Sequence, residues 1–304
     1  MREAVIVSAA RTPIGKAYRG AYNNTAAPTL ASYSIKEAVS RAGIDPGEVD
    51  DIVMGCAQQQ GSQALNIGRL GGIAAGLPNT VSGMTIDRQC SSGMMAIATA
   101  SKQIITDNMD TVVAGGVESI SLVQTAEIRL DIDPNVTEHA QHAYMPMIET
   151  ADNVAEKYNV SREDQDEYSL QSQQRTAAAQ ESGIYADEVI STTTTKLVKD
   201  KESGEISEEE VTLEKDEGNR PETNLEGLSS LMPVYGEGKC ITAGNASQLS
   251  DGSASVVVME AKVAEKKGLS PIGYYRGMSV AGLAPEEMGI GPIYAVPKLL
   301  ERFN

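Results

Sequence analysis

Tryptophan is absent from this 304-residue sequence, and phenylalanine occurs once beside eleven tyrosines. The core must therefore consist mainly of aliphatic side chains and alanine, as in parallel sheets covered by helices. Three cysteines are too few, and odd in number, for a disulfide framework, which favours a reducing compartment; we predict a cytoplasmic protein. Basic residues are scarce too, with 25 Lys and Arg against 42 Asp and Glu, a net charge of −17. Nucleic acids and anionic membranes are therefore not expected partners, because their surfaces recruit Lys and Arg.

Long apolar runs are also lacking: none approaches the roughly 20 residues of a membrane-spanning helix. The first seven residues enter a strand-like pattern without a secretory signal. The length predicts two domains of ordinary size.

Short apolar runs alternate with segments of helical spacing over the first 120 residues. The spacing predicts strands over 4–9, 51–56, 81–86 and 111–117, and helices over 31–42, 66–75 and 92–105. This alternation predicts a parallel α/β sheet with both faces covered. Farther on we predict a polar helical stretch over 151–182, an exposed acidic excursion over 199–226, strands over 254–259 and 272–280, and a helix over 296–303.

Cys90 lies in the segment Gln89-Cys90-Ser91-Ser92-Gly93, between a predicted strand and a predicted helix. At the N-terminus of a helix, unpaired N–H groups and the helix dipole favour a thiolate. By position alone, an inert packing role stays open beside a nucleophilic one. Glycines with small polar neighbours over 115–119 and 243–247 leave room for a ligand at a sheet edge, and neither segment fits a P-loop or GxGxxG.

Taken together, these segments closely resemble the thiolase family, the acetyl-CoA acetyltransferases and 3-oxoacyl-CoA thiolases. The matching pieces are SAARTPIGK (8–16), CSSGMMAI (90–97), AGGVESIS (114–121), SREDQDEYSLQS (161–172), TAGNASQLSDGSA (242–254) and MGIGP (288–292). The resemblance implies two stacked βαβαβαββ halves with a loop domain inserted into the first. It places the first half at 1–120 with 245–270, the coenzyme A-binding insertion at 121–244, and the beginning of the second half at 271–304.

The resemblance also assigns roles to individual residues. It makes Cys90 the nucleophile that accepts the acyl group, and it places Arg220 and Ser247 at the coenzyme A groove and Met147 beside the pantetheine arm. Two alternatives stay open: Arg220 is only a solvated charge in an acidic loop, and Met147 only packs against its neighbours. Coenzyme A is then a substrate, no metal or further cofactor is expected, and the implied assembly is a homodimer or homotetramer.

Three catalytic motifs of the family do not occur in the 304 residues: N-E-A-F, G-H-P and the C-x-G of a second cysteine. We expect neither His139 nor His142 to replace the histidine, and we expect Cys56 and Cys240 to be structural. Three explanations are open: a chain shortened at its C-terminal end, which we favour, a split enzyme completed by another polypeptide, or a natural non-catalytic remnant. The 304 residues alone are expected to be inactive.

The expected activity is that of an acyl-CoA thiolase in fatty acid metabolism, by ping-pong Claisen condensation or thiolysis through an acyl-cysteine. A ketoacyl or hydroxymethylglutaryl synthase would share the fold and the cysteine, but the TAGNAS and GGVES segments favour a thiolase. A non-catalytic protein that binds acyl-CoA, or that dimerises, is the alternative from another class.

Overall fold

The computed structural model describes residues 2–127 and 131–303, which form two compact units. Unit 1 comprises residues 1–128, 183–218 and 249–275, and unit 2 comprises 129–182, 219–248 and 276–304. Both units draw on the predicted insertion, and residues 183–218 of it group with unit 1. This division differs from the predicted domain boundaries, because the hairpin in 183–218 is bonded to the segment that follows the first strand. That 121–244 forms one coenzyme A-binding domain stays a prediction.

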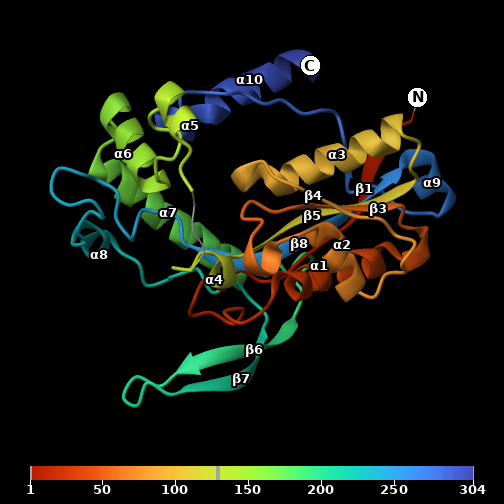
Figure 1. Cartoon of the computed structure of the whole chain (residues 1–304), viewed down its shortest axis with the longest axis horizontal. Coiled ribbons are helices and arrows are strands. Elements are labelled where there is room, and N and C mark those ends of the chain that lie inside the picture. Colours follow the sequence, from red (N-terminus) through yellow and green to blue (C-terminus); the bar gives the residue numbers. More distant parts are fainter. Residues whose placement is uncertain (1, 128–130, 304) are drawn as a thin grey trace. The chain divides into compact units, whose positions relative to one another are not determined.

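Unit 1 is built on a seven-stranded sheet with the order β4-β3-β5-β8-β1-β9, with β2 paired to β8 (Figure 1). Its strands are β1 (Ala4–Arg11), β2 (Gly15–Lys16), β3 (Asp51–Gly55), β4 (Met84–Ile86), β5 (Thr111–Ser119), β8 (Ser250–Glu260) and β9 (Gly273–Tyr274). Its helices are α1 (Ala27–Ala42), α2 (Ile67–Ala74), α3 (Ser92–Thr106), α4 (Ile120–Val123) and α9 (Ala261–Lys266). Read along the chain, β1 to β5 with their helices and then β8 give the predicted βαβαβαββ pattern.

The sheet is mixed, so the prediction of a parallel sheet was wrong in part. β3 is parallel to β4 and β5, but β8 lies between β5 and β1 and is antiparallel to both. The second half of β8, residues 256–259, is apolar on both faces, which is also how a parallel strand looks in sequence. Its direction depends on the long connection after β5, which carries no local signal. The predicted strand over 272–280 is reduced to β9, and 296–303 is helical as predicted.

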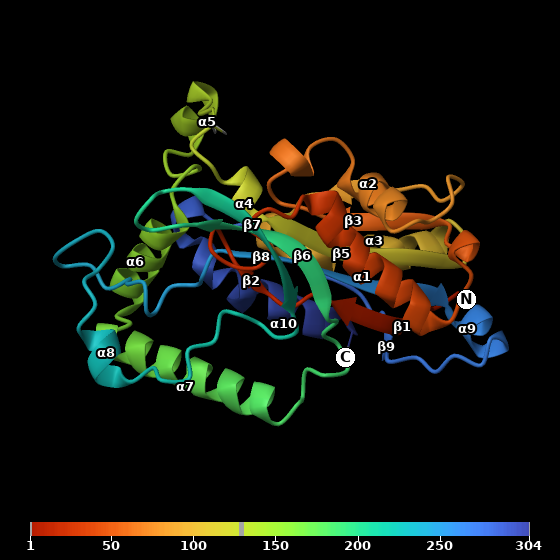
Figure 2. The same ribbon diagram turned by 90° about the horizontal axis from the view of Figure 1, so that it is seen from below.

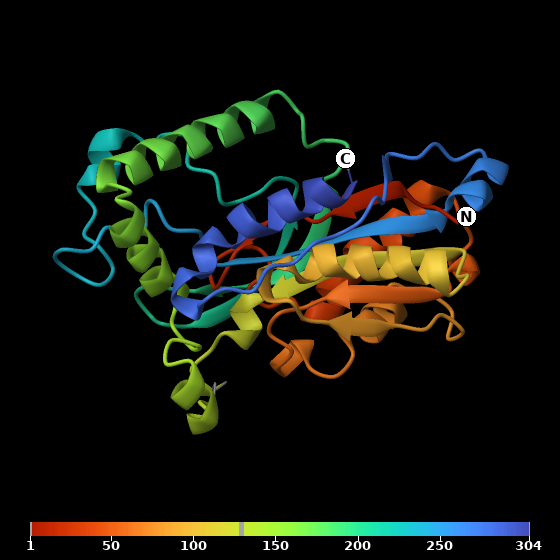
Figure 3. The same ribbon diagram turned by 90° about the horizontal axis from the view of Figure 1, so that it is seen from above.

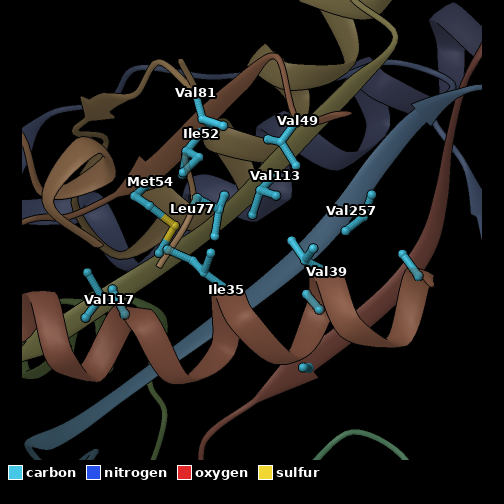
Figure 4. Packing of buried hydrophobic residues seen from close by; sticks show 14 of the residues in the cluster. Ile35, Val39, Val49, Ile52, Met54, Leu77, Val81, Val113, Val117 and Val257 are labelled. Carbon is cyan, nitrogen blue, oxygen red and sulfur yellow. The ribbon is translucent and has the colours of Figure 1, made fainter. Parts of the chain in front are cut away.

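Aliphatic side chains fill both faces of the sheet, as the lack of aromatics predicts. On the face covered by α1 and α2, Ile35 and Val39 of α1 pack with Val113 of β5 and Val257 of β8 (Figures 2 and 4). On the other face α3 packs through Ala96, Ala100 and Ile104 against the neighbouring residues of the same strands (Figure 3). Tyr22 alone among the aromatic residues described is buried.

A hairpin that the sequence analysis missed lies within the acidic middle. β6 (Thr192–Lys199) pairs antiparallel with β7 (Ile206–Leu213). The threonines of β6 favour a strand. The glutamates of β7 are exposed, so that β7 lacks the apolar residues by which a strand is recognised in sequence. Hydrogen bonds join β6 to the segment that follows β1: Tyr22 Oη lies 2.5 Å from Thr192 Oγ1, and Asn23 Nδ2 donates to Leu197 O at 2.9 Å.

Unit 2 is mainly helical, with α5 (Pro134–His139), α6 (Met147–Tyr158), α7 (Arg162–Glu181), α8 (Leu225–Ser229) and α10 (Gly291–Phe303). The helical stretch predicted over 151–182 is two helices, because Asn159 takes a left-handed conformation at φ 54° and ends α6. Ser161 then caps α7, accepting from the N–H of Asp164, while the Asp164 carboxylate accepts from the N–H of Ser161.

Candidate active site

The carboxyl ends of β4, β3 and β5 meet at one edge of the sheet in unit 1. The register places Gly55 of β3 opposite Ile86 of β4 and Gly116 of β5. The chain leaves β4 at Ile86 and begins α3 at Ser92. Because this connection is short, Cys90 lies at the edge where the strands end, the usual location of ligand sites in α/β sheets.

Glycines let the first turn of α3 lie directly on these strand ends. A Cβ atom added to Gly55 would come within 2.2 Å of the carbonyl carbon of Ser92, and one on Gly116 within 3.3 Å of Gly93 Cα. A side chain at Gly55 would therefore push the helix off the sheet. Gly116 belongs to the segment 115–119, which the sequence predicted to leave room for a ligand, and in the structure it serves close backbone packing.

Cys90 is exposed and lies in a single turn of 3₁₀ helix, Gln89–Ser91. Gln89 is left-handed at φ 48°, which is uncommon for a residue other than glycine. Its N–H donates to Asp87 Oδ1 at 2.6 Å, and its C=O accepts from Ser92 Oγ at 2.6 Å. The turn that carries the thiol is thus held on both sides.

The N-terminus of α3 has no capping bond from the Ser91 side chain, whose Oγ donates to Arg88 O at 3.0 Å instead. The positive end of the helix dipole therefore faces the turn of Cys90. The oxygen of an acyl group attached to Cys90 would be stabilised there.

A hydrogen-bonded carboxylate lies near the end of β5. Glu118 accepts from the N–H groups of Ala57 at 3.0 Å and Gln58 at 3.2 Å and from Gln63 Nε2 at 2.5 Å. Gln63 is fully buried and also accepts from the N–H of Ser119. Glu118 therefore ties the loop after β3 to the end of β5. Sequence reasoning singled out the GGVES segment but missed Gln63, whose neighbours carry no motif.

Cys56 is buried beside this network, and Gln63 Nε2 donates to its Sγ at 3.2 Å. Burial, with a smaller contribution from Glu118, raises the pKa of Cys56 to about 12. A thiol with such a pKa is protonated at neutral pH and is a poor nucleophile. This agrees with the structural role expected for Cys56.

Unit 2 contains a cavity of about 250 Å³. Its lining comes from α7, α8 and the segments beside them: Gln173, Arg220, Glu222, Thr223, Asn224, Gly227, Leu228, Leu231, Ala243, Gly244, Ala246 and Gln248. Arg220 is exposed, and its backbone N–H donates to Gln173 Oε1 at 2.8 Å. Arg220 is the cation and Glu222 the carboxylate among the lining residues.

Asp216 and Glu217, the two acidic residues that precede Arg220, accept hydrogen bonds within unit 1. Asp216 accepts from Arg11 Nη1 at 2.7 Å and from the N–H of Ile14 at 2.7 Å. Glu217 accepts from the N–H of Lys16 at 2.8 Å. These carboxylates hold the SAARTPIGK segment, so they are not loose charges of an acidic loop.

The sequence model described as Thiolase, N-terminal domain, matches residues 4–262. The chain belongs to the thiolase family. It is 41% identical over 303 residues to a 3-ketoacyl-CoA thiolase of Bacillus subtilis, with 99% of this chain and 77% of the relative covered. It is 40% identical over 322 residues to a β-ketoadipyl-CoA thiolase of Pseudomonas aeruginosa, covering 100% of this chain and 77% of the relative.

Solved thiolase structures share the fold. The crystal structure of the Bacillus anthracis acetyl-CoA acetyltransferase matches with a TM-score of 0.85 at 39% identity, covering 100% of this chain and 77% of that one. Human mitochondrial 3-ketoacyl-CoA thiolase in complex with CoA matches with a TM-score of 0.81 at 32% identity, covering 97% and 74%. The predicted family and fold class are thereby confirmed.

The thiolase residues singled out in the sequence are found in both units. Cys90 precedes α3 in unit 1, as predicted. In unit 2, Arg220 lines the cavity, and Ser247 is exposed between the lining residues Ala246 and Gln248. Met147 begins α6, is 54% exposed and is not among the lining residues. Their roles in this thiolase stay predictions.

Two features are absent from the described residues, 2–127 and 131–303: a cluster of metal ligands and a helix that could span a membrane. No cluster of three or more His, Cys, Asp or Glu side chains in that part of the thiolase could hold a metal ion. No helix there is long and apolar enough to cross a membrane.

Proposed function

We propose that this thiolase transfers acyl groups between coenzyme A thioesters, with Cys90 as the nucleophile. The observation that carries the proposal is the exposed thiol in a hydrogen-bonded turn at the uncapped end of α3. A thiolate suits such an exchange because it is both a good nucleophile and a good leaving group.

In thiolysis, the Cys90 thiolate attacks the 3-oxo carbon of a 3-oxoacyl-CoA. The bond between C2 and C3 breaks, and its electron pair stays on C2, which takes up a proton to give acetyl-CoA. The acyl group is left as a thioester on Cys90. The thiolate of a second coenzyme A attacks that carbonyl carbon, acyl-CoA leaves, and the Cys90 thiolate is restored. The reverse sequence forms the carbon–carbon bond.

Coenzyme A is the proposed occupant of the cavity in unit 2. Its phosphates are anionic and the chain carries −17, so a local cation must hold them, and Arg220 is the cation in the lining. The complex of the human relative with CoA supports this choice. Ser247 is proposed as a neighbouring contact, and Met147 as a contact of the pantetheine arm. No metal or further cofactor is part of the proposal.

Trapping the acyl-enzyme tests the proposal. After incubation with acetyl-CoA, mass spectrometry of the intact protein should show one added acetyl group, and peptide mapping should place it on Cys90. Cys90→Ser should show none, whereas Cys56→Ala and Cys240→Ala, which keep the nucleophile, should be acetylated like the parent. Acetylation of Cys90→Ser at the parent rate would remove Cys90 from the mechanism.

We further propose that residues 1–304 by themselves do not turn over. They include no G-H-P histidine to activate Cys90 and no C-x-G cysteine to move the α-proton. Thiolysis of acetoacetyl-CoA by this polypeptide should be undetectable, alone and at several protein concentrations. Full activity would refute this, whereas activity gained only with a second polypeptide would identify a split enzyme.

A second candidate function is a non-catalytic protein that binds acyl-CoA. Iodoacetamide separates the two: rapid alkylation of Cys90, slowed by an acyl-CoA, supports the enzyme, and an inert thiol supports the binding protein. We propose a homodimer or homotetramer, which light scattering on a sizing column would test. A cytoplasmic location also stays a proposal, because a mouse relative 37% identical to this chain is named peroxisomal.

A further inference from the structure

We propose that Asp166 is a positioning residue that holds two walls of the unit 2 cavity together and thereby sets its affinity for coenzyme A. The inference rests on the proposed coenzyme A function of that cavity. Asp166 itself does not line the cavity.

Asp166 is an unusual residue for its helix. Among the twenty residues of α7, all of them described, it alone is buried, with 3% of its surface exposed. The side chains of α7 form no apolar stripe. A buried carboxylate is costly unless it is paired and hydrogen-bonded.

One oxygen of Asp166 is linked through Arg162 to the part of the cavity lining that contains Leu228 and Leu231, which we call the α8 wall. Asp166 Oδ2 accepts from Arg162 Nε at 2.8 Å. Arg162 Nη2 in turn donates to Leu228 O at 2.7 Å and to Leu231 O at 3.1 Å. Leu228 and Leu231 both line the cavity, so the carboxylate fixes the guanidinium that holds this wall.

The other oxygen is linked through Asn245 to the loop 242–246, which forms another part of the cavity lining and which we call the loop wall. Asp166 Oδ1 accepts from Asn245 Nδ2 at 3.1 Å, and Asn245 Oδ1 accepts from the N–H of Thr242 at 2.8 Å. The fully buried Thr242 hydroxyl oxygen accepts from the N–H of Gly244 at 3.1 Å. The cavity-lining residues Ala243, Gly244 and Ala246 belong to this closed loop.

The two walls also touch each other. A Cβ atom on Gly244 would lie 2.6 Å from Leu228 Cδ2 and 2.6 Å from Leu231 Cδ1. Asp166 thus joins, through its two oxygens, the backbones of two segments that already pack side by side. Gln173, farther along α7, lines the same cavity and binds the N–H of Arg220. The helix α7 therefore positions the α8 wall, the loop wall and the backbone of Arg220.

Asp166→Asn tests this arrangement. The carboxamide keeps the size of the side chain but presents N–H to one of two donors, so one wall must come loose. Titration calorimetry with coenzyme A should give a dissociation constant about tenfold higher than that of the parent. Hydrogen exchange should rise at the amides of Gly244 and Asn245 with the core strands unchanged. Glu167→Gln, which removes an exposed carboxylate from the same helix, should change neither measurement.

The double variant Asp166→Asn with Asn245→Asp restores a donor and an acceptor between the two side chains but loses the bond from Asn245 Nδ2 to Cys240 O. It should therefore recover part of the affinity. If Asp166→Asn does not fold, Asn245→Ala leaves the bond between Asp166 and Arg162 in place and removes the side-chain bonds of Asn245 to Asp166, Thr242 and Cys240. This variant should still weaken binding and raise exchange in the loop. A folded variant of either kind that binds coenzyme A like the parent would overturn the positioning role. A parent that does not bind coenzyme A would instead refute the proposed function of the cavity.

Discussion

Gly55 and Ser92 lie so close that a Cβ on Gly55 would stand 2.2 Å from the Ser92 carbonyl carbon, which ties the end of β3 to the turn of Cys90. Gly55→Ala should therefore displace the first turn of α3. We expect a loss of about 2 kcal/mol or more in the free energy of unfolding, as for overpacked cores, together with a slower reaction of Cys90 with iodoacetamide. Urea unfolding and the alkylation rate measure the two effects.

Gly93→Ala is the matched control. A Cβ there meets Gly115 O at 3.7 Å, an ordinary contact, and alanine favours the helix. The free energy of unfolding should fall little or rise by up to about 1 kcal/mol. Equal losses in both variants would show that close packing at Gly55 is not what positions the turn.

Cys56→Ala should lower the free energy of unfolding by about 1 kcal/mol at pH 7, because a small buried side chain is removed. The pKa of Cys56 is raised to about 12 in the folded protein, so its contribution to stability is present below pH 9 and is lost as the pH rises toward 12. The stability gap between parent and variant should therefore narrow over this range. Unfolding curves at several pH values measure the gap, and parallel profiles would contradict the raised pKa.

This prediction concerns an enzyme that turns over, such as residues 1–304 complemented by a second polypeptide. In that enzyme Arg220→Ala should raise the KM for coenzyme A about tenfold, with a smaller effect on kcat, because a remote contact contributes mostly uniform binding. Added salt should weaken coenzyme A binding by the parent more than by the variant, because salt screens the phosphate contact. Lys201→Ala removes an exposed cation of unit 1 and should leave KM unchanged. A fall in kcat alone would argue against this placement of Arg220.

Tyr22→Phe should cost about 1 kcal/mol of unfolding free energy, because the buried Thr192 hydroxyl loses its partner at 2.5 Å. Tyr33 also bonds the hairpin, donating to Thr193 O at 3.0 Å, but in an exposed position. Tyr33→Phe should cost less, because water can replace the hydroxyl. Thermal unfolding of both variants decides the comparison, and a larger loss for Tyr33→Phe would contradict this account of how the hairpin is held.

Local patterns in the sequence determined the first half of unit 1. The apolar strand 51–56 and the helix 92–105 were predicted to within a residue or two, because strand alternation and helical spacing are properties of neighbouring residues. The short connection after Ile86 also placed Cys90 before α3. The motifs around Cys90 and Ser247 were enough to identify the family, because their order and spacing are visible in the chain itself.

Tertiary structure decided what depends on distant partners. The direction of β8 follows from its place between β5 and β1, which its apolar pattern does not encode. Asp166 looks in sequence like any solvated acid of a polar helix. It is buried because Asn245, 79 residues away, and Arg162 meet it from two sides. A buried carboxylate is stable only when such donors converge on it, and that convergence exists only once the chain has folded.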